Sequence, residues 1–193
     1  VYSATKHIDG QGRTLGGAIL TNNNHLYKSV FTPFLRHTGP ALSPFNAWVL
    51  LKGLETLKMR INYYCKAAKE IAIFLDKHPR FFDVRYPMLS THPQYNLAIE
   101  QMAGGGSIIS FKVGKNRKNT FIFLNSLKVL KISNNLGDTK SLITHPATTT
   151  HHRLGREKLK HLGIADNLVR LSIGLEDIND IQRDLDAASR HLS

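Results

Sequence analysis

The sequence has little cysteine and no long hydrophobic run, and each absence excludes a class of protein. Cys65 is the single cysteine in 193 residues, so an internal disulfide framework is excluded and a reducing compartment, the cytoplasm, is expected. The longest apolar runs, such as residues 47–51 and 71–75, fall well short of the ~18 residues that a membrane helix needs. No apolar segment follows a basic start, so no signal peptide is predicted. We therefore expect no membrane association.

The composition is that of an ordinary globular protein. Hydrophobic residues make up 41%, charged residues 21% and aromatic residues 8%, which argues against a disordered or collagen-like chain. A length of 193 residues fits one large domain or two small ones. The chain begins at Val1 rather than at a methionine, so we expect a fragment or a cut product of a longer protein.

Positive charge exceeds negative charge, with 26 Lys+Arg against 14 Asp+Glu and a formal net charge of +12. Such an excess favours contact with polyanions. The basic residues are scattered, however, and no aromatic residues are interleaved with them to stack on bases. We expect mainly solvated surface charge and no nucleic-acid partner, and a non-catalytic basic binding module remains the alternative. The densest basic segments contain Lys112, Lys115, Arg117 and Lys118, and then Arg153, Arg156, Lys158 and Lys160.

The first half of the chain predicts glycine-rich turns followed by a long helix. Residues 1–20 indicate a short strand end and a turn region that contains several glycines. Ser43 suits a helix N-cap and Pro44 suits the first helical position. From there to about Lys77, apolar residues recur at helical spacing. Because a helix of this length often bridges two domains, we place a domain boundary near residue 60.

The second half of the chain alternates between strand and helix patterns. This mixture predicts an α/β or α+β module with a half-buried sheet. Asp177 is an expected N-cap of the last helix. The predicted strands cover residues 81–86, 107–113, 128–133 and 168–173, and the predicted helices cover 93–102, 119–127, 152–162 and 177–188.

The segment Ser3-Ala4-Thr5-Lys6 places an amine and two hydroxyl groups just before a glycine-rich turn. An amine can form a Schiff base with a carbonyl cofactor, and hydroxyl groups can hold a phosphate. Short matches of this kind are frequent by chance, so these residues alone favour a solvated surface lysine over an active one.

Four longer segments, taken together in their order along the chain, change that interpretation. They resemble the cystathionine γ-synthase-like family of pyridoxal-phosphate (PLP) enzymes of cysteine and methionine metabolism, most closely its O-succinylhomoserine sulfhydrylase branch. The resemblance runs nearly from end to end. The segments are VYSATKHIDGQGRTLGG at residues 1–17, TGPALSPFNAWVLLKGLETLKMR at 38–60, ISNNLGDTKSLITHPATTTH at 132–151 and LVRLSIGLED at 168–177.

The resemblance implies an α/β fold made of two parts. Residues 1–60 would be the C-terminal end of the large, PLP-binding domain of a fold-type I transferase. A long bridging helix would then lead into residues 61–193, a smaller α/β C-terminal domain with a mainly antiparallel sheet. In the family, a whole segment precedes the first of these motifs, and this supports the interpretation as a fragment.

The resemblance also implies roles for individual residues. Lys6 matches the lysine that carries PLP and moves protons on the substrate, and Ser3 and Thr5 match the hydroxyl groups that hold the cofactor phosphate. Arg170 matches the arginine that binds the substrate α-carboxylate, which suits a planar and permanently charged guanidinium. Asn135, a second predicted substrate-binding residue, stands where many relatives carry serine, which argues against the cystathionine lyases. The alternatives are a solvent-facing arginine on an edge strand for Arg170 and a turn residue for Asn135.

The reaction that the resemblance implies is γ-replacement, in which O-succinylhomoserine or O-acetylhomoserine reacts with sulfide to give homocysteine. Cystathionine γ-synthase or methionine γ-lyase chemistry on the same fold is the nearest alternative. The family forms dimers of dimers. Its other PLP contacts lie upstream of the position that Val1 matches. We therefore expect the chain alone to lack turnover and to expose apolar surface.

Three histidines lie close together in the sequence, at His145, His151 and His152. They would suggest a metal site, but no paired cysteine or carboxylate completes a ligand set there. We expect no metal.

Overall fold

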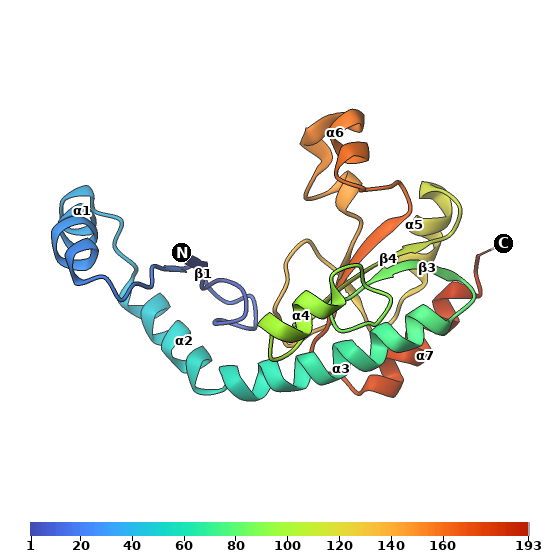
Figure 1. Ribbon diagram of the computed structural model, residues 1–193, viewed down its shortest axis with the longest axis horizontal. Helices are drawn as coiled ribbons and strands as arrows, with labels where there is room; N and C mark the ends of the chain where they lie inside the picture. Colours follow the sequence, from blue (N-terminus) through green and yellow to red (C-terminus); the bar gives the residue numbers. More distant parts are fainter. Residues whose placement is uncertain (193) are drawn as a thin grey trace. The chain divides into compact units, whose positions relative to one another are not determined.

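The computed structural model describes residues 1–192, and its contacts divide the chain into two compact units, Val1–Lys58 and Met59–Ser193. Helix α3 (Leu57–Lys77) begins at the end of the first unit and continues in the second (Figure 1). Within residues 1–192, the structure contains no helix with the length and hydropathy of a membrane span.

The first unit combines a small antiparallel ladder with helices. Ser43 caps helix α2, because its side chain accepts a hydrogen bond of 3.1 Å from the backbone N–H of Asn46, and Pro44 is the first helical residue. The predicted start of this helix is therefore confirmed. The elements are β1 (Tyr2–Ser3), β2 (Gly17–Ala18), the π-helical turn η1 (Leu26–Phe31), α1 (Thr32–Thr38) and α2 (Pro44–Glu55).

The helical segment from Leu26 to Thr38 was not predicted from the sequence. It carries two ordinary helix signals, a proline in the first turn and Gly39 directly after the last turn. Gly39 has φ +75°, a left-handed conformation that glycine adopts without the steric cost of a Cβ atom.

The predicted single helix from Pro44 to Lys77 is wrong in one respect, because Thr56 interrupts it. Thr56 has φ −108° and ψ 1°, outside the helical region, so α2 ends at Glu55 and α3 begins at Leu57. The apolar periodicity continues across this residue, and so the sequence pattern does not reveal the break. Thr56 is β-branched, and such residues have a lower helix propensity than unbranched ones.

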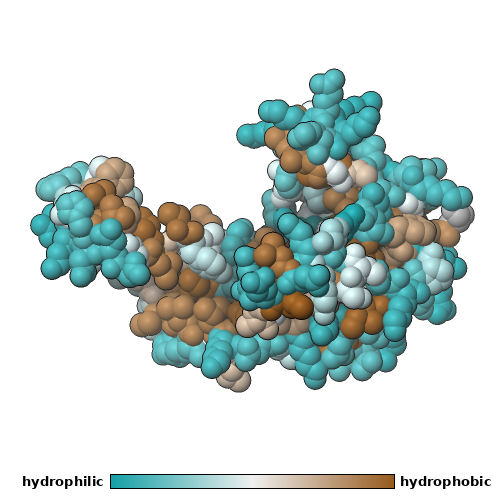
Figure 2. All heavy atoms as spheres, in the orientation of Figure 1, coloured by the Kyte–Doolittle hydropathy of each residue, from teal (hydrophilic) through white to brown (hydrophobic). Residues whose placement is uncertain are grey.

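Apolar side chains remain exposed in the first unit, as expected for this chain. Figure 2 shows them as brown atoms over the region of α1 and α2. The exposed apolar residues of this unit include Leu15, Ile19, Leu20, Tyr27, Phe34, Leu42, Phe45, Trp48, Leu51 and Leu54.

The second unit is built on a sheet of five strands in the order β3-β4-β7-β6-β5. All neighbouring pairs are antiparallel except β5 and β6, which are parallel, so a mainly antiparallel sheet is confirmed. The strands are β3 (Phe81–Arg85), β4 (Ile108–Val113), β5 (Lys131–Ile132), β6 (Leu142–Thr144) and β7 (Leu168–Ser172). The helices after α3 are α4 (Tyr95–Gln101), α5 (Arg117–Ser126), α6 (Gly155–His161) and α7 (Ile178–Ser189), with short 3₁₀ turns η2 (Pro146–Thr148) and η3 (His152–Leu154).

The core of the second unit lies between the sheet and helices α3, α5 and α7. Helix α3 contributes a stripe of buried residues at spacings of three and four, from Tyr64 to Leu75. Phe81, Phe111 and Phe123 meet edge to face, with ring centroids 5.2 to 6.3 Å apart. Strand residues alternate between this core and the opposite face of the sheet, which carries Ser110, Lys112 and Arg170 together with Ile108 and Leu168.

The predicted strand over residues 128–133 is shorter than expected, because Asp184 takes the place of a ladder partner. The carboxylate of Asp184 on α7 accepts hydrogen bonds of 2.8, 2.9 and 3.0 Å from the backbone N–H groups of Lys128, Val129 and Leu130. A buried backbone donor needs a partner, and here a side chain supplies it. Only Lys131–Ile132 remains as strand β5.

Strand β6 was not predicted, although it lies next to the central strand β7. Its three residues, Leu142–Thr144, are all buried. A strand this short, followed closely by Pro146, is a weak sequence signal. Backbone pairing with both β5 and β7 holds these three residues as a strand instead.

Candidate active site

Lys6 lies in a tight turn that leaves strand β1. Its backbone N–H donates to the carbonyl oxygen of Ser3 at 3.2 Å, and its own carbonyl accepts from the N–H of Gly10 at 2.8 Å. Gly10 has φ 70° and Gly12 has φ 64°, so the chain reverses through two left-handed residues where a side chain would be strained. The half-buried lysine is thus carried on a closed turn rather than on a flexible tail.

The carboxylate of Asp9 holds this turn closed. Asp9 is 1% exposed, and it accepts hydrogen bonds from the backbone N–H of Arg13 at 2.6 Å and from its Nε at 2.9 Å. Arg13 Nη2 also donates to the carbonyl oxygen of Asp9 at 2.8 Å. A buried carboxylate with a guanidinium partner and a backbone donor is a strong local restraint. Asp9 was not singled out from the sequence, although it lies in the first matched segment.

Replacing Asp9 with asparagine is expected to destabilise the first unit by about 1–3 kcal/mol, because an amide would face the two donors of Arg13 in place of a carboxylate oxygen. Urea denaturation followed by the fluorescence of Trp48 would measure the loss. The control is Glu55→Gln, which removes an exposed ion pair with Lys52 at 2.7 Å and should change stability little. Equal effects of the two substitutions would contradict the role given to Asp9.

Helix α2 packs closely against the lysine turn at Gly53. A Cβ atom on Gly53 would lie 2.0 Å from the carbonyl oxygen of Ile8, so only glycine lets the helix and the turn approach so closely. Ala4, in the middle of the Ser-Ala-Thr-Lys segment, is 3% exposed. Gly53 lies in one of the four matched segments. The need for glycine at this position comes from the tertiary contact with Ile8 and could not be inferred from the local sequence pattern.

The two hydroxyl groups next to Lys6 differ in what they contact. Ser3 is exposed, and its hydroxyl forms no hydrogen bond with any residue in the described range 1–192. The hydroxyl of Thr5 accepts a hydrogen bond of 3.0 Å from the N–H of Gly16 and donates to its carbonyl oxygen at 3.3 Å. An amine beside a hydroxyl that is open to a phosphate suits a phosphorylated aldehyde such as PLP. Thr5 closes the β1–β2 ladder here, and its contact with a phosphate stays a prediction.

Arg170 lies on β7, in the interior of the sheet. It is opposite Ser110 of β4 and Thr144 of β6 in the strand registers, so the alternative of an edge-strand arginine is wrong. Its neighbours Val169 and Leu171 belong to the hydrophobic core. Because side chains alternate along a strand, Arg170 is on the face of the sheet opposite that core.

Asn135 and Arg170 are brought together by the structure. Arg170 Nη2 donates to the carbonyl oxygens of Asn134 at 2.9 Å and Asn135 at 3.3 Å. Within residues 1–192 these bonds use only Nη2, so other N–H groups of the guanidinium stay available for a carboxylate. Burial lowers the pKa of the Arg170 guanidinium below its usual value, and an arginine remains charged at neutral pH. Asn135 therefore orients the arginine through its backbone.

Residues after Arg170 anchor the Asn135 loop, and none of them was predicted to do so. The hydroxyl of Ser172 accepts a 3.0 Å hydrogen bond from the N–H of Gly137. The carboxylate of Glu176 accepts from the N–H of Ser141 at 2.7 Å and from its hydroxyl at 2.8 Å. A Cβ atom on Gly174 would lie 2.4 Å from the carbonyl oxygen of Thr139. The matched segment at 168–177 thus carries both the arginine and the supports of the loop that orients it.

The predicted site residues form two groups, one in each unit. Ser3, Thr5 and Lys6 lie at the end of β1 and in the turn that follows it, and Arg170 of β7 contacts the loop that contains Asn135.

His145 is held by groups of the protein itself. Its Nδ1 lies 2.8 Å from the hydroxyl of Thr148, and its Nε2 lies 3.0 Å from the carbonyl oxygen of Asp166. No cluster of three His, Cys, Asp or Glu residues that would hold a metal ion occurs within residues 1–192.

Comparison with known proteins gives matches along nearly the whole chain. The family model described as Cys/Met metabolism PLP-dependent enzyme matches residues 1–190. O-succinylhomoserine sulfhydrylase from Mycobacterium tuberculosis is 53% identical over 194 residues, which cover 97% of this chain and 47% of that protein. L-methionine γ-lyase from Fusobacterium nucleatum subsp. polymorphum is 39% identical over 186 residues, covering 96% of this chain and 47% of that protein.

Solved structures agree with these matches. Cystathionine γ-synthase from Xanthomonas oryzae pv. oryzae, in complex with aminoacrylate and cysteine, is 35% identical with a TM-score of 0.93, covering 98% of this chain and 49% of that chain. An O-acetylhomoserine (thiol)-lyase, described as putative, from Campylobacter jejuni contains a pyridoxyl-lysine phosphate. It is 32% identical with a TM-score of 0.87 and covers 97% of this chain and 52% of that chain. The chain spans about half the length of the curated relatives it matches.

Proposed function

Because the chain belongs to the Cys/Met metabolism PLP-dependent enzyme family, we propose that the protein containing it replaces the acyl group of an O-acylhomoserine with sulfide. The product would be homocysteine, and O-succinylhomoserine is the substrate we favour. The observation that carries this choice is the 53% identity with an O-succinylhomoserine sulfhydrylase, against 39% with a methionine γ-lyase. The family match confirms the resemblance inferred from the four sequence segments. The TM-scores of 0.93 and 0.87 confirm the fold that it implied.

The family depends on PLP, and the Lys6 turn fits that cofactor. We propose that the amine of Lys6 binds the aldehyde carbon and that the exposed hydroxyl of Ser3 holds the phosphate, with Thr5 beside it. PLP, when bound, supplies an electron sink for the loss of a proton from the substrate Cα. The amine of Lys6 would accept that proton and transfer protons at the neighbouring carbons, which requires an orientation fixed to a fraction of an ångström. The hydrogen bonds of the turn and the close contact with Gly53 support this proposal, because they restrain the backbone that carries the amine.

The guanidinium of Arg170 would bind the α-carboxylate of the substrate. Its Nη2 is already fixed by the carbonyl oxygens of Asn134 and Asn135, so the remaining donors are preorganised toward an incoming anion. The carbonyl contact also fits Asn135 as a residue that positions the arginine.

We propose that the two units belong to two different domains of the whole protein. Val1–Lys58 would be the end of the cofactor-binding domain, and the unit that starts at Met59 would be the smaller C-terminal domain. We further propose that the whole protein forms a dimer of dimers. We place it in the cytoplasm, where the cysteine of this chain, Cys65, would stay reduced.

The proposed reaction is tested by offering competing nucleophiles to a protein of the relatives' length that contains this chain. With O-succinylhomoserine, we expect sulfide to give homocysteine at least about tenfold faster than cysteine gives cystathionine or water gives the γ-elimination product. Product identification by mass spectrometry would distinguish the three reactions. Faster formation of cystathionine, or elimination that sulfide does not suppress, would overturn the proposal in favour of one of the related activities. The chain of 193 residues alone serves as a second sample and should be inactive.

A further inference from the structure

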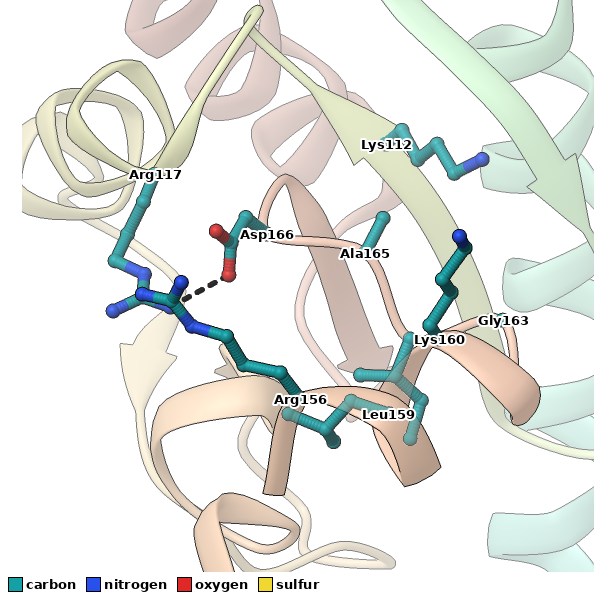
Figure 3. A pocket seen from close by; sticks show the side chains of 9 residues that line it. Lys112, Arg117, Arg156, Leu159, Lys160, Gly163, Ala165 and Asp166 are labelled. Carbon is teal, nitrogen blue, oxygen red and sulfur yellow. Dashed lines mark hydrogen bonds and ion pairs between the residues drawn. The ribbon is translucent and has the colours of Figure 1, made fainter. Parts of the chain in front are cut away.

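The two densest basic segments of the sequence, near residues 112–118 and 153–160, meet in one pocket of the second unit. The pocket has a volume of about 420 Å³, within the range of roughly 300–1,000 Å³ that is typical of small-molecule sites. Its cationic lining comes from three elements, β4, α5 and α6. The nine lining residues are Lys112, Arg117, Arg156, Leu159, Lys160, Gly163, Ile164, Ala165 and Asp166 (Figure 3).

The four cations lie on two sides of the pocket. Figure 3 shows Lys112 and Lys160 on one side, and Arg117 and Arg156 with their guanidinium groups near Asp166 on the other. Arg156 and Lys160 are four residues apart on α6, so both lie on the same face of that helix.

The negative charge in and around the pocket does not balance these cations. Asp166 pairs with Arg117 at 2.6 Å, and Lys112 pairs with Asp83 at 3.0 Å. The side chain of Lys160 makes no hydrogen bond or ion pair with any residue in the described range, and Arg156 interacts with Asp166 only through the field of its charge. Like charges that share a pocket repel one another, and a bound anion would relieve that repulsion.

The lining also indicates what kind of anion fits. The apolar contribution comes from Leu159, Ile164 and Ala165, and the pocket has no aromatic side chain on which a base would stack. Guanidinium groups bind phosphate oxygens in pairs, and lysine amines bind them as point charges. Cations on two opposite sides suit a ligand with two adjacent anionic groups better than one with a single charge.

We propose that this pocket binds the diphosphate group of a small molecule, with Arg156 and Lys160 as its main anchors and Lys112 and Arg117 completing the charge around it. Anion binding in this pocket is independent of the proposed reaction. All of the lining residues belong to the second unit, and none of them is a residue of the proposed active site.

Isothermal titration calorimetry of the full chain with inorganic pyrophosphate tests the proposal, with inorganic phosphate at matched ionic strength as the reference. The double variant Arg156→Gln, Lys160→Gln should weaken pyrophosphate binding about tenfold or more, because it removes two cations that would donate hydrogen bonds to the phosphate oxygens. The matched control is Arg153→Gln, Lys158→Gln, which removes the same charge from the same segment outside the pocket lining. It should change the affinity less than about twofold, because an exposed charge outside the site acts only through a screened field.

Each outcome of this experiment decides for or against the pocket. Pyrophosphate binding that is lost in the pocket variant and kept in the control supports the proposal. Equal losses in both variants would mean general attraction to a chain of net charge +12, and absence of binding or equal binding of phosphate would also overturn it. Adenosine diphosphate separates a free diphosphate from a diphosphate ester. Affinity similar to that of pyrophosphate supports recognition through the diphosphate alone, and binding of the nucleotide only would contradict it.

Discussion

The Lys6→Ala protein is expected to lose turnover by a factor of about 10³ or more, because in the proposed site one amine both attaches the cofactor and transfers protons. The change removes the side chain beyond Cβ and keeps the backbone N–H and carbonyl of Lys6, which form hydrogen bonds with Ser3 and Gly10 in the turn. Homocysteine formation in a protein of the relatives' length measures the loss. Borohydride reduction followed by peptide mapping should place a pyridoxyl label on Lys6 in the unsubstituted protein and none in the variant.

Two controls make this experiment decisive. Lys28→Ala removes an exposed lysine from the same unit and should retain both label and activity. A small external amine should restore part of the activity of Lys6→Ala, because a free base can occupy the space of the missing side chain, and it should not change the control. A pyridoxyl label on another residue, or full activity in Lys6→Ala, would contradict the assignment of Lys6 as well as the cofactor fit of the turn.

The residues of the proposed site could be selected from the sequence because they belong to four long segments that resemble one family. The few residues around Lys6 or Arg170 did not suffice on their own, and the assignments depended on the order of the four segments along the chain. The supports of these residues were missed. Gly53 acts through a contact with Ile8 that is 45 residues away in the chain, and Glu176 reaches Ser141 across 35 residues. No local periodicity encodes such a contact.

The fold shows the same division between local and non-local determinants. The long apolar stripe of α3 and the alternation in β7 are local patterns, and both elements were predicted. Strand β6 depends on its partners on both sides, and the truncation of the strand after residue 127 depends on Asp184 from the last helix. The break at Thr56 changes only one residue's conformation and leaves the periodicity intact. Tertiary contacts and single backbone angles, rather than propensity, therefore account for the errors.

Substitution of Arg170 should raise KM for the amino-acid substrate far more than it lowers kcat, because the role proposed for the arginine is to hold a carboxylate that does not react. Arg170→Ala leaves a bound carboxylate unpaired and should cost about 2–5 kcal/mol, which corresponds to a KM about thirty-fold to several thousand-fold higher. Arg170→Lys keeps the charge and loses the planar pair of donors, so we expect an intermediate increase. Steady-state kinetics with O-succinylhomoserine would give both parameters, and Arg183→Lys, an exposed arginine on α7, is the control.

A substrate analogue without the α-carboxylate distinguishes direct binding from a structural role of Arg170. If the guanidinium binds that carboxylate, the analogue should react slowly and equally slowly with the original protein and with Arg170→Ala, since the interaction is absent in both cases. A structural role in holding the loop at Asn134 and Asn135 would instead lower the rate with the analogue further in the variant. That second result, or an unchanged KM in Arg170→Ala, would remove the carboxylate anchor from the proposed site and leave Arg170 as a support of the loop.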